Sequence, residues 1–273
     1  MNIIQNFKNE MENSGLICEE QVVFDGKIHR FHVQHDSPGS KNGWYVLYDT
    51  PVPFGIYGCW KRNIRQIWHA ANLNDFSLDQ KEAYKIKITE AHIQATESRK
   101  QAQIAAKQKA KKIWDEAEVA SSTHPYLIDK KIKAFNIKQI NHNLLIPLYD
   151  TQNELRSLQF ISSDGKKIFL ADGATKGFFY HIGKLTPEIY LCEGYATGAT
   201  IHEATNCYVI IVFSSGNLIS VSQAIHNKYF NHKIIICADN DQWSENNIGV
   251  IKAIEASKVF KSSNKQSILQ STP

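Results

Sequence analysis

The sequence predicts an α+β protein whose C-terminal part is an α/β domain built on a parallel sheet. Two observations lead to this fold class. From about residue 20 to 70, short segments rich in aromatic and β-branched residues alternate with turn sequences such as "DSPGSKNG", a pattern typical of antiparallel strands. From residue 188 onward, continuous apolar runs appear instead, each followed by a helix-compatible stretch: "EIYLCE", "CYVIIVFSS" and "KIIICADND". Strands that are apolar on both faces and alternate with helices indicate a parallel sheet with crossover helices.

These changes of pattern divide the chain into four regions. Residues 1–76 form a β-rich module that begins with a short amphipathic helix, in which Ile4, Phe7 and Met11 are at helical spacing. Residues 77–120 form a long basic helix or linker, because no Gly or Pro occurs from Ser77 to about Val119 and "SLDQ" offers a capping box. Residues 121–186 hold short strands, from "NHNLLIPLYD" to "GFFYHIG", and predict a small antiparallel unit. Residues 187–273 complete the chain with the parallel sheet and its crossover helices.

The long helix has two interpretations. Between Ser98 and Trp114 it carries no acid but six cations, Arg99, Lys100, Lys107, Lys109, Lys111 and Lys112. Such a surface could meet phosphates. A helix that is polar nearly all round can equally be a solvated connector between domains, and this second interpretation is favoured.

Composition excludes several classes of protein. An apolar fraction of 42 % with 11 % aromatic residues is typical of a folded protein and excludes a disordered one. The five cysteines are scattered without a C-x-x-C pair, which favours reduced thiols in a cytoplasm. No apolar run is long enough to cross a bilayer, so we expect a cytoplasmic protein without a membrane partner. The net charge of +4 indicates no particular partner.

Carboxylates follow two of the expected parallel strands. Glu193 ends the first strand, and Asp239 and Asp241 end the third. Because the carboxyl ends of parallel strands lie on one edge of a sheet, we expect the three side chains to converge. Their oxygen atoms suit Mg²⁺ or Mn²⁺, and no Cys/His set has the spacing of a zinc site. The alternative is that the aspartates cap a helix or a turn.

A family resemblance rests on these same segments. "YLCEGYATGATIHEAT", "VIIVFSSGNL" and "IIICADND" resemble the Toprim catalytic domain in the form found in DNA primases of bacteriophages and plasmids. Upstream, "DGKIHRFHV", "GCWKRNIRQIWHA", "HPYL" and "LRSLQFISSDGKKIFL" also resemble those proteins, so that residues 121–186 match the N-terminal subdomain of the primase core and residues 187–273 the Toprim domain. The resemblance implies synthesis of RNA primers from ribonucleoside triphosphates on single-stranded DNA, for a phage, plasmid or other mobile element, beside a separate helicase.

The resemblance also assigns roles to residues. It implies that Glu193 binds metal or does acid–base work, and that Asp239 and Asp241 are metal ligands; all three are candidate catalytic residues. The candidates for binding nucleotide or template are Arg156, Lys166, Lys167, Lys176, Gly194, Ser215 and Asn217. The basic residues among them could instead be ordinary exposed turn residues. Two further functions stay open: a Toprim nuclease or other phosphodiester hydrolase, and a catalytically weak DNA-binding accessory that recruits a helicase or blocks a host factor.

The aromatic residues of the N-terminal module allow two interpretations. Trp44, Tyr45, Trp60 and Trp68 occur among four cations, Lys41, Lys61, Arg62 and Arg65. Rings beside cations can clamp unpaired bases. Most such rings in a small β unit are its core, which is the interpretation favoured for Trp44 and Trp60, while Trp68 stays open.

Overall fold

The computed structural model describes residues 3–36, 38–50, 53–71, 77–239, 248–261 and 267–272. Two compact units divide the chain, Met1–Ala105 and Ala106–Pro273. The boundary between them falls inside a long helix, α2 (Leu78–Glu116), which therefore contributes residues to both units. Each unit is described by itself below.

An antiparallel meander of four strands forms the N-terminal unit, as the sequence predicts. Its elements are α1 (Ile3–Asn13), β1 (His29–Phe31), β2 (Gly43–Tyr48), β3 (Phe54–Cys59) and β4 (Ile64–His69). The first helix ends at a glycine: Gly15 has φ +73°, and the N–H of Leu16 donates to the carbonyl of Met11 at 2.9 Å.

The two faces of this sheet are covered by different helices. Side chains alternate along a strand, so Tyr45 and Leu47 of β2 face α1, where they pack with Phe7. Trp44 and its alternate neighbours on β2 face α2. The core role predicted for Trp44 is confirmed by its 3 % exposure. Trp68, left open by the sequence, packs edge-to-face on Phe7 with ring centroids 5.6 Å apart.

Helix α2 begins with the predicted capping box. The N–H of Ser77 donates to Gln80 Oε1 at 2.8 Å, and the N–H of Gln80 donates to Ser77 Oγ at 3.2 Å. Most of the helix is exposed or half-buried and it spans both units, as a connector would, but alanines also give it a narrow buried stripe. Ala91 and Ala95 pack on the N-terminal sheet, and further along the stripe continues within the C-terminal unit. Alanine is small, so a stripe of alanines brings a helix close to a sheet without adding strongly apolar residues to its sequence.

A five-stranded antiparallel sheet begins the C-terminal unit, in the order β5-β6-β7-β8-β9. Its strands are β5 (Glu118–Val119), β6 (Lys138–Ile140), β7 (Asn143–Tyr149), β8 (Leu155–Ser162) and β9 (Lys167–Phe169), and helix α3 (Pro125–Lys130) lies between β5 and β6 in the chain. The last part of α2 covers this sheet, where Ala106 and Ala110 pack with Leu158 and Leu170. The antiparallel unit predicted for this region is therefore present.

The second sheet of this unit has the order β10-β12-β11-β13-β14. Its strands are β10 (Tyr180–Ile182), β11 (Glu188–Cys192), β12 (Tyr208–Ile211), β13 (Lys233–Asp239) and β14 (Ser267–Thr272), connected by the helices α4 (Tyr195–Thr205), α5 (Ser215–His226) and α6 (Ile248–Lys261). The predicted parallel sheet is confirmed, since β12, β11, β13 and β14 are parallel neighbours. Strand β10 lies antiparallel on β12.

The position of β10 differs from the expectation. The sequence groups "GFFYHIG" with the strands of the antiparallel unit, and the structure places Tyr180–Ile182 in the parallel sheet instead. Only the residue before it, Phe179, bridges back to Tyr149 of β7. Tyr180 and Ile182 are buried in the core that both sheets share, which explains the exchange, because pairing with β12 keeps their apolar side chains covered.

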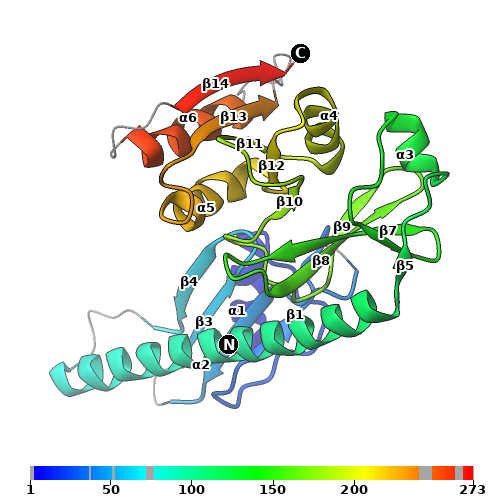
Figure 1. Cartoon of the computed structure of the whole chain (residues 1–273). Coiled ribbons are helices and arrows are strands. Elements are labelled where there is room, and N and C mark those ends of the chain that lie inside the picture. The colour runs from blue at the N-terminus through cyan, green and yellow to red at the C-terminus, as the bar shows by residue number, and fades with distance from the viewer. Residues whose placement is uncertain are drawn as a thin grey trace. The chain divides into compact units, whose positions relative to one another are not determined.

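Helices cover both faces of the parallel sheet (Figure 1). Helices α5 and α6 pack on one face in a cluster that includes Leu218 and Phe260. Helix α4 packs on the other face, where Tyr195 and Ala199 share a core with strands of the antiparallel sheet. The hydroxyl of Tyr195 accepts from the N–H of Phe135 at 2.9 Å and lies 3.1 Å from the carbonyl of Lys133. The two sheets of the C-terminal unit are therefore joined through α4.

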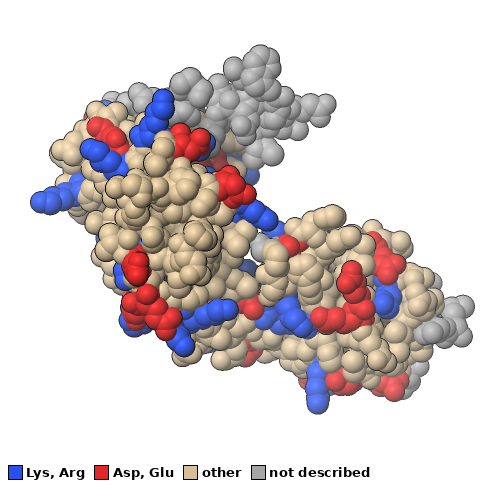
Figure 2. Space-filling model, turned by 90° about the vertical axis from the view of Figure 1, so that its right-hand side faces the viewer, with Lys and Arg blue, Asp and Glu red and all other residues tan. Residues whose placement is uncertain are grey.

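Charges of both signs are mixed on the face of the molecule drawn in Figure 2. On the face drawn in Figure 2, Lys and Arg are interspersed with Asp and Glu over broad uncharged areas. Any recognition of phosphate on this face therefore depends on small local groups of side chains. None of the described helices is both long and apolar enough to span a membrane.

Candidate active site at the carboxyl edge of the parallel sheet

Three neighbouring parallel strands end at one edge of the sheet. Strand β11 lies between β12 and β13, and all three run in the same direction. Glu193 directly follows β11, residues 213–217 follow β12, and Asp239 is the last residue of β13. The prediction that these strand ends share an edge is confirmed. Asp241 and the side chain of Asp239 lie outside the described part of the chain.

Glu193 is held at this edge by its neighbour strand. The carbonyl of Cys192 accepts from Val212 and that of Glu193 accepts from Phe213, each at 2.9 Å, so the pairing of β11 with β12 continues past both strands. Phe213 has φ +71°, which is unfavourable for a bulky side chain. Its ring meets that of Phe169 from β9 edge-to-face at 6.0 Å. Glu193 itself is half-buried.

The register places Asp239 beside Glu193. Glu188 is paired with Lys233 and Leu191 with Ile236, so Glu193 is level with Ala238 on the adjacent strand. Neighbouring strands lie about 4.8 Å apart. The backbone of Asp239 is therefore one residue beyond the point level with Glu193, on the adjacent strand.

A lysine from the antiparallel sheet reaches the same loop. Lys167 begins β9, and its Nζ lies 3.5 Å from the position that a Cβ on Gly194 would occupy. Gly194 immediately follows Glu193 and caps the start of α4. Lys166 is the preceding residue, and adjacent side chains of an extended segment point to opposite faces, so it points away from Gly194. Of the two lysines predicted to bind, the structure brings Lys167 to the edge.

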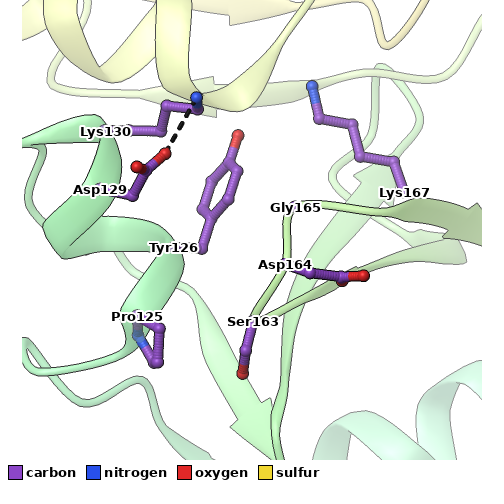
Figure 3. A pocket seen from close by; sticks show the side chains of 8 residues that line it. All are labelled: Pro125, Tyr126, Asp129, Lys130, Ser163, Asp164, Gly165 and Lys167. Atoms are coloured by element: carbon purple, nitrogen blue, oxygen red, sulfur yellow. Dashed lines mark ion pairs between the residues drawn. The ribbon is translucent and has the colours of Figure 1, made fainter.

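Lys167 also lines a cavity of about 430 Å³ between α3 and the β8–β9 hairpin (Figure 3). From the opposite wall, Tyr126 and Lys130 extend toward the same side of the cavity as Lys167. Lys130 pairs with the neighbouring Asp129 at 3.0 Å. Sequence reasoning did not single out these residues of α3. The signal for them is "HPYL", in which the His124 side chain caps the helix by accepting from the N–H of Tyr126 and Pro125 opens it.

A second group of predicted residues gathers around Phe178. Asn217, in the first turn of α5, is buried, and its Oδ1 accepts from Gly177 at 2.7 Å. Its Nδ2 donates to the carbonyls of Phe178 and Val212 at 3.0 and 2.9 Å. The amide therefore ties the 177–178 loop to the end of β12, and these contacts occupy the groups that would otherwise meet a nucleotide.

Arg156 of β8 reaches the same loop from the antiparallel sheet. Its guanidinium lies 5.2 Å from the centroid of the Phe178 ring, within range of a cation–π contact. Its Nη1 is 3.6 Å from carboxylate oxygens of both Asp150 and Glu154. Glu154 also pairs with Lys107 of α2 at 2.8 Å. Arg156 is thus oriented by its neighbours, and the two carboxylates offset much of its charge.

Of the remaining two predicted residues, one lies on a loop and the other at the start of α5. Lys176 is exposed and precedes Gly177, which has φ +80°. Ser215 is half-buried and begins α5.

Helix α4, which follows Gly194, packs closely on β12, since a Cβ on Gly198 would lie 2.7 Å from Ile211 Cγ1. The second glycine of "EGYATG" is therefore required for the contact between α4 and β12.

The predicted metal ligands are carboxylates, a donor set that suits a hard divalent ion. Mg²⁺ is commonly held by one or two carboxylates together with water and substrate phosphates, so Glu193 and Asp239 at adjacent strand ends fit such an ion. Among the residues whose side chains are described, no group of three or more His, Cys, Asp or Glu could hold a metal. Two members of the predicted metal set, Asp239 and Asp241, are not among those residues.

Comparison with known families agrees with this architecture. The family model described as the Toprim domain matches residues 188–247, the segment that runs from β11 past β13. This segment is a Toprim domain. Glu193 and both aspartates of the predicted metal set lie inside the matched residues.

Similarity to DNA primases extends far beyond the Toprim domain. A DNA primase TraC of Escherichia coli is 30 % identical over 254 residues, which cover 88 % of this chain and 24 % of that protein. A second DNA primase TraC of Escherichia coli is 27 % identical over 254 residues, covering 87 % of this chain and 17 % of the relative. This chain therefore spans a quarter or less of the length of these two relatives. The solved structure of the DnaG catalytic core matches 63 % of this chain and 71 % of its own, with 11 % identity and a TM-score of 0.41.

Proposed function

We propose that this chain is the primer-synthesising part of a DNA primase, which joins ribonucleotides on a single-stranded DNA template. The proposal rests on the short distance between Lys167 and the Glu193–Gly194 loop. This loop belongs to a chain of which 88 % is similar to a DNA primase TraC. A cation from one sheet and carboxylates from the other suit a triphosphate whose charge must be balanced on two sides.

In the proposed reaction, the 3′ oxygen of one nucleotide forms a bond to the α-phosphorus of the next. The bond from that phosphorus to the oxygen it shares with the β-phosphate breaks, and pyrophosphate leaves with the electron pair. Glu193 either accepts the proton of the attacking hydroxyl or joins Asp239 and Asp241 in holding metal. A divalent ion, Mg²⁺ or Mn²⁺, would neutralise charge on the phosphates when bound there.

The other residues of the edge position the substrates. Lys167 would meet phosphate oxygens beside Gly194, because its Nζ lies 3.5 Å from the position of a Cβ on that glycine. Asn217 acts through the 177–178 loop, which it anchors, and Arg156 stacks on the same loop. Lys176 and Ser215 border this loop and are available to template or nucleotide, whereas Lys166 adds charge on the other face of the hairpin.

The proposed setting is the cytoplasm of a cell that carries a phage, plasmid or other mobile element. Template strands become accessible only after a duplex is unwound, and a separate helicase would supply them. We propose that the chain consists of an N-terminal module (residues 1–76), a helix (residues 77–120) and a catalytic core. The core is made of residues 121–186 and 187–273.

One assay separates this function from its rivals. The full chain is incubated with single-stranded DNA, labelled ribonucleoside triphosphates and Mg²⁺ or Mn²⁺, and both nucleic acids are resolved on a gel. Short RNA products support the primase. Shortened template without RNA would favour a Toprim nuclease, and a mobility shift without either product would favour a DNA-binding accessory.

A further inference from the structure

A row of charged and aromatic residues crosses one face of the N-terminal sheet. Arg30 of β1 is paired with Trp44 of β2, Trp44 with Gly58 of β3, and Gly58 with Arg65 of β4. Residues paired directly across strands share a face, so both arginines flank Trp44 on the α2 side. Gly58 makes room for the indole, because a Cβ there would lie 3.1 Å from two atoms of the Trp44 ring.

Trp60 gathers two guanidiniums over this row. Its ring is stacked on that of Trp44 at 6.0 Å between centroids. Arg30 lies 4.9 Å and Arg99 of α2 lies 5.8 Å from the centroid of Trp60. Arg30 is also fixed by the carbonyl of Lys41, which accepts from its Nε and Nη2 at 3.1 and 2.8 Å. The Arg30 guanidinium is therefore held in place before any ligand arrives.

Two arginines of this cluster, Arg65 and Arg99, differ from other cations of the unit. Within the described part of the chain, neither Arg65 nor Arg99 forms an ion pair, whereas Lys61 pairs with Asp36 at 2.8 Å. Burial, followed by the charge of Arg30, lowers the pKa of Arg99. Arginine stays charged at neutral pH despite such a shift, so Arg99 can attract an anion.

We propose that Arg30, Arg99 and Trp60, with Arg65 beside them, bind the phosphodiester backbone of single-stranded DNA. Guanidinium groups are weakly hydrated and match phosphate oxygens in pairs, and an aromatic ring beneath them keeps them oriented. Three arginines can neutralise only a few phosphates, which suits a short single strand better than the broader contact made by a duplex-binding surface. The choice of DNA as the bound strand rests on the proposed function. The phosphate site itself is inferred only from the arrangement of these arginines around Trp60.

The test compares two neighbouring cations of the full chain. Arg99→Gln removes a guanidinium of the cluster, and Lys100→Gln removes the next charge along α2 as a matched control. Binding of a fluorescent oligo-dT is followed by anisotropy over a range of salt, in EDTA and without nucleotides. We expect Arg99→Gln to weaken binding roughly five- to tenfold and to lower the salt slope by about one, and Lys100→Gln to change affinity less than about twofold.

Further measurements decide each outcome. Arg65→Gln should weaken binding in the same direction, and unchanged thermal melting shows that the variants are folded. Equal affinity of the Arg99→Gln and Lys100→Gln proteins would overturn the site, and equal competition by RNA or by duplex DNA would overturn the choice of single-stranded DNA. Wild-type protein that binds through Arg99 but makes no RNA would contradict the proposed function alone. Primer synthesis together with unchanged Arg99→Gln binding would contradict this inference alone.

Discussion

In the parallel sheet of the C-terminal unit, the charged side chains follow the ends of strands, whereas in the antiparallel sheet of the N-terminal unit they stand in a row across four strands. The first arrangement places Glu193 and Asp239 on adjacent strands. The second places Arg30 and Arg65 on the two outer strands with Trp44 between them. The two proposed sites therefore have opposite charge and use different properties of a β-sheet.

The difference has a physical reason. All strands of a parallel array point one way, so polar loops and helix N-termini collect at a single edge, where small charged ligands and metal ions are bound. An antiparallel sheet has no such edge. It brings charged side chains together only where its register aligns them across neighbouring strands. We therefore expect the parallel edge to carry chemistry and the antiparallel row to carry binding. The predictions below test that separation.

The largest expected effect is at the parallel edge. Asp239→Asn should lower primer synthesis by about 100-fold or more, because a charge that acts on the transition state is lost, while single-stranded DNA binding stays nearly unchanged. Asp115→Asn, which removes an exposed carboxylate of α2, is the control and should keep full activity. Product yield and anisotropy measure the two properties. Loss of binding in parallel with activity would break the separation of chemistry from binding.

A smaller effect is expected where the two sheets of the C-terminal unit meet. Tyr195→Phe removes a buried hydroxyl and leaves the N–H of Phe135 and the carbonyl of Lys133 without their partner. The free energy of unfolding should fall by about 2 kcal/mol. Tyr190→Phe is the control, since the Tyr190 hydroxyl makes no hydrogen bond to the described residues, and urea unfolding measures both. Equal stability of the two variants would show that the hydroxyl of Tyr195 is not what joins α4 to the antiparallel sheet.

The two lysines of the β8–β9 hairpin give the next comparison. Lys167→Ala should lower kcat/KM for ribonucleotide roughly tenfold, which corresponds to about 1.4 kcal/mol, because its ammonium lies beside Gly194. Lys166→Ala should change the same constant less than about twofold, since this side chain points to the other face. Steady-state incorporation of labelled ribonucleotide measures both. A larger loss in Lys166→Ala would reverse the assignment.

The last effect concerns the N-terminal unit and appears only at high pH. Burial raises the pKa of Tyr84 to about 12, and its hydroxyl lies 2.9 Å from His69 Nδ1. The unfolded chain releases this proton near pH 10, so the stability due to neutral Tyr84 is complete below about pH 10 and is lost as pH rises toward 12. Tyr84→Phe should therefore lose less stability than wild type between these pH values. Urea midpoints at several pH values measure the change, and parallel curves for the two proteins would exclude the contribution of Tyr84.

Much of the C-terminal unit could be predicted because its information is local. Each strand of the parallel sheet is a continuous apolar run, and Glu193 and Asp239 lie within a residue of a strand end. That these strand ends share one edge then follows from topology alone. The capping box at Ser77 is local in the same way, since four consecutive residues contain both of its hydrogen bonds.

Other features depend on contacts between distant residues, which the pattern does not encode. The row through Arg30, Trp44 and Arg65 appears only when three strand registers are known. The packing of α2 depends on alanines, which hardly change the polarity of the helix. Whether β10 joins one sheet or the other is decided by which partner covers Tyr180 and Ile182. Similarly, only the structure distinguishes Lys167 from Lys166, because both have the same chemistry.

The most direct test of the catalytic assignment is synthesis of the first dinucleotide. The full chain is given a single-stranded template, labelled ribonucleoside triphosphates and Mg²⁺ or Mn²⁺, with Glu193→Gln protein alongside. We expect wild type to form a labelled dinucleotide whose sequence follows the template, and Glu193→Gln to form almost none while binding the template equally well. Equal dinucleotide yield from the two proteins, or no dinucleotide from wild type on any template with either metal, would contradict the account.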